Sequence, residues 1–187
     1  MTRVLALLIV AAFAFNARAA FAQFNDTRDI MDFGPNFTSA NPIPREVVYF
    51  HSRYAPGTIV ISTSERRLYL VLPDGRALRY GIGVGCDGFR WSGQHRITRV
   101  AEWPGWTPPA AMRKRVPDLP AYMPGGPDNP LGARALYIGS TLYRIHGTSE
   151  PWTIGQAVSS GCIRLTNEDV TDLYERVRVG ALVVVNQ

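Results

Sequence analysis

The stretch Ser159-Ser160-Gly161-Cys162-Ile163-Arg164 places an arginine two residues after a glycine-flanked thiol. Upstream, His146 ends the apolar run Tyr143-Arg144-Ile145 and is followed by Gly147-Thr148. A thiol, a histidine and an arginine are the side chains that a cysteine acyl-transfer enzyme needs. The rest of the chain is therefore read as the scaffold that brings these three side chains together.

The chemistry of such a trio follows from the ionisation of the thiol. A free thiol has a pKa near ~8.5, and an adjacent imidazolium can lower that value by several units, so that a thiolate is available to attack a carbonyl. The backbone N–H of Cys162 can bind the developing oxyanion. Gly161 suits the bend before the nucleophile, because it lets a substrate approach the main chain without a Cβ in the way.

Strand alternation predicts how these side chains face one another. If residues 162–164 are extended, Cys162 and Arg164 lie on one face while Ile163 points into the core. The same alternation puts Arg144 and His146 on one face of the upstream strand. A lone histidine is more often a satisfied core residue, but the flanking Gly-Thr and the cysteine motif favour a catalytic histidine here.

The first 22 residues are typical of a secretory signal peptide. Arg3 precedes the uncharged run 4–15, and Ala20-Phe21-Ala22 is a small-x-small cleavage site before Gln23. The apolar run is too short to span a bilayer as a helix. We therefore expect an exported protein, located in the periplasm and not membrane-spanning, with cleavage near Ala22.

The charge of the chain does not indicate a nucleic-acid partner. Removing residues 1–22 takes away Arg3 and Arg18 and lowers the formal charge from +5 to +3. The remaining cations, all arginine except Lys114, are scattered rather than gathered into a stripe, which a nucleic-acid binder would need. A mildly basic surface fits solvated charge with a weak attraction to an anionic wall polymer.

Cys86 and Cys162 leave two readings open. In an exported chain two cysteines can form a disulfide, and this is the main competitor of catalysis. A domain of this size does not need a covalent cross-link, and the residues around Cys162 serve no purpose for a half-cystine. We therefore read Cys162 as a free nucleophile and Cys86 as a free thiol without an assigned role.

Two cofactor readings are set aside. Residues 83–88 match the dinucleotide pattern G-x-G-x-x-G, but residues 89–93 do not begin the helix that this pattern requires. We expect these glycines to form a tight bend where another backbone approaches. His51, His95 and His146 are isolated, so no metal site is expected.

The pattern of short strand-like runs and turn residues predicts one mainly β domain. Residues 23–50 are assigned to an extended leader or linker and residues 51–187 to the catalytic domain. Pro73-Asp74-Gly75-Arg76 predicts a hairpin turn. Strand-like runs occur at 46–50, 58–62, 67–72, 77–84, 96–102, 135–138, 142–146 and 181–185.

One helix is predicted near the end of the chain. Val170, Leu173, Tyr174 and Val177 recur at helical spacing, and Thr166 with Asp169 forms a capping-box pattern before them. The segment 103–130 fits no regular element, because it holds eight prolines. It is either a lid or groove wall beside the thiol or a surface excursion packed by its own aromatic side chains.

At these motifs the chain resembles the L,D-transpeptidase catalytic domain of bacterial cell-wall enzymes. The resemblance covers roughly residues 56–185. It is carried by 80–85, 129–136, 144–148, 154–155, 159–164, and Asn167 with Asp169. Trp91-Ser92-Gly93, where many relatives have Thr-Pro-x-Gly, resembles the alphaproteobacterial branch. The implied fold is a β-sandwich-like arrangement of mixed sheets with a small helical element.

The resemblance implies a role for each site residue. Cys162 would be the nucleophile, and His146 the general base, oriented by the carbonyl of Gly147. The oxyanion and substrate-binding residues would be Ser160, Gly161, Arg164, Arg144 and Thr148. Many relatives carry a second histidine at the position of Ser160, so a two-histidine mechanism is not expected.

The implied reaction cleaves peptidoglycan tetrapeptide stems, releases D-alanine and passes the acyl group to an amine. The amine belongs to another stem, giving a 3–3 cross-link, or to an envelope protein. Carbapenems acylate the same cysteine in the family, no cofactor is used, and a monomer is expected. Two alternatives stay open: a carboxypeptidase or amidase on the same scaffold, and a non-catalytic peptidoglycan-binding module.

Overall fold

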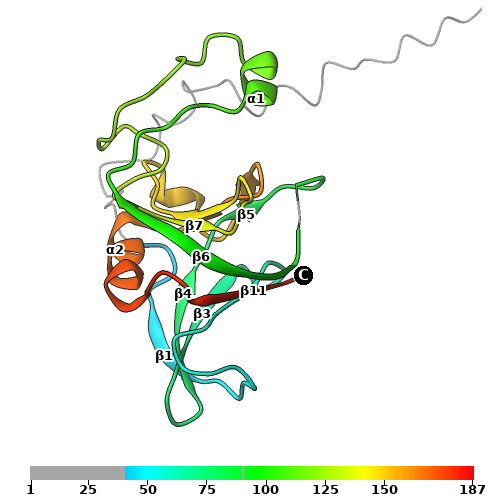
Figure 1. Ribbon diagram of the computed structural model, residues 1–187, viewed down its shortest axis with the longest axis vertical. Coiled ribbons are helices and arrows are strands. Elements are labelled where there is room, and N and C mark those ends of the chain that lie inside the picture. The colour runs from blue at the N-terminus through cyan, green and yellow to red at the C-terminus, as the bar shows by residue number, and fades with distance from the viewer. Residues whose placement is uncertain (1–40, 90) are drawn as a thin grey trace, which may run out of the picture. The chain divides into compact units, whose positions relative to one another are not determined.

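The computed structural model describes residues 41–89 and 91–187. The predicted signal peptide lies outside these residues. The described part is mainly β (Figure 1), and it holds no helix that is both long and apolar enough to cross a membrane. The helices are α1 (Ala110–Arg115), the short 3-10 turn η2 (Pro151–Thr153) and α2 (Asn167–Arg176). The strands are β1 (Glu46–Tyr49), β2 (Ile59–Ser62), β3 (Arg67–Leu72), β4 (Arg76–Gly81), β5 (Val84–Gly85), β6 (Gly93–Glu102), β7 (Arg134–Ile138), β8 (Arg144–His146), β9 (Ala157–Ser159), β10 (Ile163–Arg164) and β11 (Leu182–Asn186).

The main sheet is mixed and curled. Its strand order is β1-β4-β3-β2-β11-β6-β7-β8-β10, with β11 parallel to β2 and β10 parallel to β8. The long strand β6 connects the two halves, because its beginning pairs with β11 and its end pairs with β7. The register shifts between Ile97 and Arg99, and such irregularities bend a strand. The prediction of a mainly β fold with mixed sheets and one late helix is confirmed.

The core follows the alternation of the strands. Ile59 and Ile61 of β2 are buried opposite Leu70 and Leu68 of β3, with which they are paired. Burying such apolar side chains is the main stabilising contribution, about 1.5–3 kcal/mol for each of them. The helix α2 covers part of this core and contacts β7 and β8. In Figure 1, α2 is the orange helix at the side of the sheet that contains β7.

The local signals that predicted α2 and the hairpin are confirmed. The side chain of Thr166 accepts a hydrogen bond from the Asp169 N–H at 3.1 Å, which caps the helix. On the inner face of α2, Val170 and Leu173 are buried. Asp74 and Gly75 have φ of 59° and 64°, the pair of positive values that a tight hairpin between β3 and β4 requires.

The sheet begins at the edge strand β1, which pairs with β4. The predicted boundary between residues 50 and 51 therefore assigns β1, a strand that is paired with the sheet, to the leader and not to the catalytic domain. Just before β1, Arg45 donates to Asp169 at 2.9 Å. The segment that precedes the sheet is thus attached to the beginning of α2.

A second, two-stranded sheet supports the thiol-bearing segment. It consists of β5 and β9 in parallel. Just before β5, Gly83 exchanges two backbone hydrogen bonds of 2.9 Å with Arg164 of β10. A Cβ on Gly85 would lie 3.0 Å from Cα of Gly161. The predicted close approach of another backbone is confirmed, but Gly83 and Gly85 lie in paired, extended backbone and only Gly88, with φ of 85°, lies in a turn.

The proline-rich segment 103–130 carries a helix that the sequence did not predict. Six residues form α1, and Trp106 exchanges two backbone hydrogen bonds of 2.8 Å with Met123. Trp103 and Tyr122 remain exposed, at 44% and 59%. The segment is therefore not an excursion closed over its own aromatic side chains, and α1 lines the cavity described next.

Candidate active site

The thiol sits on a bend between β9 and β10. Gly161 has φ of +103°, a conformation that residues with a Cβ rarely adopt. The hydroxyl of Ser159 holds the bend from both sides: it accepts from the N–H of Gly161 at 3.2 Å and donates to the carbonyl of Cys162 at 2.6 Å. Cys162 follows as a partly exposed residue.

The reason for glycine at position 161 differs from the expectation. A Cβ there would overlap the ring of Tyr143 and lie 3.1 Å from the carbonyl oxygen of Phe89. The protein's own packing, and not only room for a substrate, thus excludes a side chain. The bend is enclosed by residues from two distant parts of the sequence.

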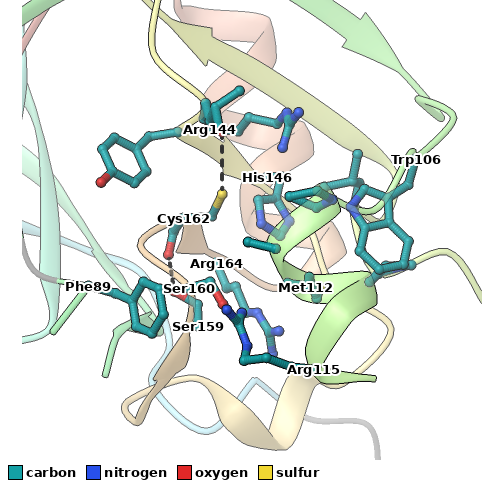
Figure 2. A pocket seen from close by; sticks show the side chains of 16 residues that line it. Phe89, Trp106, Met112, Arg115, Arg144, His146, Ser159, Ser160, Cys162 and Arg164 are labelled. Carbon is teal, nitrogen blue, oxygen red and sulfur yellow. Dashed lines mark hydrogen bonds between the residues drawn. The ribbon is translucent and has the colours of Figure 1, made fainter. Parts of the chain in front are cut away.

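The parallel pairing of β8 and β10 brings the predicted trio together. Ile163 is paired with Ile145, and both side chains are buried in the core. The alternate side chains on the other face, Arg144 and His146 of β8 with Arg164 of β10, line one cavity with Cys162 (Figure 2). The cavity measures about 400 Å³. The predicted common face of Arg144 and His146 is confirmed, but Tyr143, which strand alternation would place on the opposite face, also lines the cavity.

His146 is a buried, neutral imidazole. It is 4% exposed, and its Nδ1 lies 2.6 Å from the carbonyl oxygen of Gly147. Because a carbonyl only accepts, Nδ1 carries the proton and Nε2 keeps its lone pair. Burial, together with the charges of Arg164 and Arg144, lowers the pKa of His146 to about 3, although the carbonyls of Gly147 and Leu131 act in the opposite direction. This low pKa disfavours the imidazolium form of His146 and favours a neutral ring that can accept a proton.

The thiol and the imidazole share the cavity without a hydrogen bond between them. In the part of the chain that the structure describes, Sγ of Cys162 donates weakly to the carbonyl of Leu142, at 4.0 Å. Figure 2 shows this contact as a dashed line, with His146 on the neighbouring strand. Contacts between catalytic groups are often loose before substrate binds.

Because folded His146 is neutral, the stability of the protein should depend on pH. The unfolded chain binds a proton on this histidine below pH 6.5, whereas the folded chain does so only near pH 3. The free energy of unfolding should thus fall as the pH drops from 6.5 towards 3, by up to about 1.4 kcal/mol per pH unit. Urea titrations at several pH values measure it. The acylation rate should show no loss centred on pH 6.5, and the same stability slope in His146→Gln would contradict this assignment.

The described residues of the cavity wall include cations but no carboxylate. Arg144 and Arg164 line it from the sheet and Arg115 lines it from α1, and no acidic side chain is among the described residues of its wall. Arg164 donates to Glu150 at 3.0 Å. The Nε atoms of Arg144 and Arg164 are buried without a hydrogen-bond partner. Such a wall favours anionic groups, carboxylates above all.

The remaining predicted residues take different places. Ser160 lines the cavity beside Cys162. Thr148 is buried outside the cavity wall, and its hydroxyl accepts from the N–H of Glu150 at 3.0 Å. Gly147 contributes its carbonyl to His146.

Asn167 is a support to which sequence analysis assigned no role. Its side-chain oxygen accepts from the N–H groups of Ala133 at 2.8 Å and Thr148 at 3.3 Å. A Cβ on Gly147 would overlap that oxygen. The first residue of α2 thus fixes the backbone around the histidine. The signal available in the sequence was that Asn167 belongs to the residues that resemble the L,D-transpeptidase catalytic domain.

The described residues offer no built site for a metal or a dinucleotide. No group of three or more His, Cys, Asp or Glu side chains is gathered in a way that could hold a metal ion in residues 41–89 and 91–187. The G-x-G-x-x-G segment leads into strand β6, whereas a dinucleotide site needs a helix N-terminus there. Cys86 and Cys162 are both free thiols, so the disulfide reading has no support in this structure.

The domain that carries this cavity matches a known family. Residues 56–185 match the family model YkuD, the L,D-transpeptidase catalytic domain. Because this match covers more than half of the chain, the chain belongs to that family.

Among curated proteins, the chain is similar to two probable L,D-transpeptidases of Escherichia coli strain K12. It is 44% identical to ErfK/SrfK over 133 residues and 46% identical to YbiS over 135 residues. Each match covers 67% of this chain, but only 42% and 43% of the respective relative. The chain thus matches less than half the length of these relatives.

Two solved structures are similar to this one. A crystal structure from Brucella melitensis, described as a probable carnitine operon oxidoreductase, is 46% identical, with a TM-score of 0.54 over 79% of this chain and 96% of that one. L,D-transpeptidase 3 of Mycobacterium tuberculosis, crystallised with a faropenem-derived adduct, has a TM-score of 0.55 over 70% of this chain and 60% of that one. Its identity is 19%, so it supports the fold alone.

Proposed function

We propose that this chain is an L,D-transpeptidase that carries the acyl part of a peptidoglycan tetrapeptide stem on Cys162. The observation that carries the proposal is the shared cavity: the thiol of Cys162 and the imidazole of His146 line it from two parallel strands. Family membership supports the choice of substrate. The stem would be cleaved between its third residue and its terminal D-alanine.

Acylation begins with proton transfer from the thiol. Rotation about the Cα–Cβ bond of Cys162 turns Sγ from the carbonyl of Leu142 towards His146, whose neutral Nε2 accepts the proton as Sγ attacks the carbonyl carbon. The N–H of Cys162 stabilises the oxyanion of the tetrahedral intermediate. As the C–N bond breaks, His146 returns the proton to the amine of D-alanine, and a thioester remains.

Transfer reverses these steps with a new amine. The acceptor nitrogen attacks the thioester, gives a proton to His146 and forms an amide, and the cysteine leaves as the thiol. A second stem as acceptor gives a 3–3 cross-link, and an amine of an envelope protein gives an attached protein. Water in place of the amine would make the same site a carboxypeptidase or amidase.

The arginines are assigned to the substrate's carboxylates. Arg164 and Arg144 line the cavity together with Cys162, and the described residues of its wall include no acidic side chain. A guanidinium pairs well with a carboxylate. Glu150, now bound to Arg164, would exchange places with the substrate group. Ser160 stands beside Cys162 where many relatives have histidine, which leaves His146 as the base.

The compartment follows from the substrate. Peptidoglycan lies outside the cytoplasmic membrane, so residues 1–22 are proposed to act as a signal peptide that delivers the enzyme to the periplasm. Carbapenems should acylate Cys162, because their strained carbonyl reacts with a nucleophile poised for acyl transfer.

Product analysis tests the proposal. Purified protein is incubated with disaccharide-tetrapeptide, and free D-alanine, the muropeptides and the intact protein mass are measured. We expect a thioester adduct, D-alanine release and cross-linked dimers, and no reaction with the matched tripeptide that lacks D-alanine. Tripeptide product without dimers would assign hydrolysis instead. If neither an adduct nor a product formed, the non-catalytic peptidoglycan-binding module would be the remaining function.

A further inference from the structure

The side chain of Trp91 holds the peptide group that bears the nucleophile. Trp91 lies two residues before β6, and its indole Nε1 donates to the carbonyl oxygen of Gly161 at 2.7 Å. We infer that Trp91 is a positioning residue, which aims the N–H of Cys162 at the oxyanion. The inference deepens the proposed function, on which it rests.

The argument starts from the geometry of one peptide group. The carbonyl of Gly161 and the N–H of Cys162 belong to the same planar trans unit, so they point in opposite directions. A hydrogen bond that fixes the oxygen therefore fixes the direction of the N–H. That N–H itself donates to no acceptor in the described part of the chain, which leaves it available to a substrate.

This peptide group needs an external support. Gly161 lacks a Cβ, so its backbone has more freedom than that of any other residue type. Its φ of +103° lies in a region that glycine can leave at little cost. The hydroxyl of Ser159 holds the N–H of Gly161 and the carbonyl of Cys162, but neither group belongs to the peptide unit between them. Trp91 supplies the missing contact.

The indole is itself fixed by stacking. Its ring lies 4.5 Å from that of Tyr143, with an angle of 4° between the planes. His95 packs against it edge-on at 5.4 Å. The ring of Tyr143 also fills the space where a side chain at Gly161 would stand. The stacked pair therefore touches the bend twice, once through a hydrogen bond and once through packing.

The hydrogen bond from Trp91 to the carbonyl of Gly161 should also make the N–H of Cys162 a stronger donor. A carbonyl that accepts a hydrogen bond polarises its amide, which makes the attached N–H a better donor. Trp91 should thus strengthen oxyanion binding besides directing it. The effect is limited to steps in which an oxyanion forms.

Trp91→Phe tests the inference, because phenylalanine keeps an aromatic ring for stacking and removes the N–H. We expect the rate of Cys162 acylation by meropenem to fall roughly tenfold, the effect of one weakened donor. Alkylation of Cys162 by iodoacetamide forms no oxyanion and should change less than twofold. For the tetrapeptide, kcat should fall while KM stays within a factor of about two.

Trp152→Phe is the matched control. Trp152 is 42% exposed in η2 and does not line the cavity. Its variant should acylate at the wild-type rate. Equal acylation by Trp91→Phe and wild type would overturn the inference, and so would acylation and alkylation that fall in parallel, since that marks a general loss of thiol reactivity.

A spectroscopic measurement separates this inference from the proposed function. In 15N-edited spectra the amide of Cys162 should shift or broaden in Trp91→Phe, whereas amides of α2 should not. An unchanged Cys162 amide would refute the positioning role, whatever the activity. Wild-type protein that alkylates but never acylates would refute the proposed function, while the amide shift still decides the role of Trp91.

Discussion

Cys162→Ala is expected to form no covalent adduct with tetrapeptide stems or with meropenem and to release no D-alanine. Removal of the nucleophile of a covalent mechanism should lower turnover by at least about 10⁴-fold. The partly exposed position of Cys162 makes it replaceable without a large cavity, so the melting temperature should stay close to that of the wild type. Intact-mass spectrometry and D-alanine release measure both properties.

The second cysteine provides the control. Cys86→Ala should keep the adduct and the turnover, because Cys86 does not line the cavity. Its contacts with Ser159 and Phe89 are backbone hydrogen bonds of 3.0 Å, which alanine preserves. An adduct that persists in Cys162→Ala and disappears in Cys86→Ala would reverse the assignment of the nucleophile.

His146→Ala should lower the acylation rate by roughly 10²–10⁴-fold, the usual contribution of a general base. The deficit should shrink at alkaline pH, where hydroxide deprotonates the thiol without the histidine. Stopped-flow acylation by meropenem between pH 6 and pH 10 measures both effects.

The matched variant is His51→Ala, since His51 is exposed beside the β3–β4 hairpin. It should acylate at the wild-type rate across the same range. If the deficit of His146→Ala were the same at every pH, the histidine would act through packing and not as a base.

Much of the fold is local in origin and was predictable. The Asp74-Gly75 turn and the Thr166 cap are decided by neighbouring residues, so the β3–β4 hairpin and α2 were found from the sequence. The common face of Arg144 and His146 follows from strand alternation alone. The parallel register of β8 and β10 joins residues 18 positions apart, and no local pattern encodes it.

The parts that escaped prediction depend on distant neighbours. The neutral state of His146 results from burial and from the charge of Arg164 on another strand. Trp91 reaches Gly161 across 70 residues. The helix α1 has only six residues and lies in a segment with eight prolines, so its helical propensity was not recognised from the sequence. A sequence names candidate side chains, whereas protonation and orientation arise only when the chain is folded.

The pairing of β8 with β10 also ties reactivity to correct assembly. A slip of one residue would send Cys162 into the hydrophobic interior and Ile163 out to water, because consecutive side chains alternate. The chain therefore acquires its reactive sulfur and completes its interior in one and the same folding event. In a refolding experiment, recovery of acylation should coincide with the final acquisition of native fluorescence and never precede it.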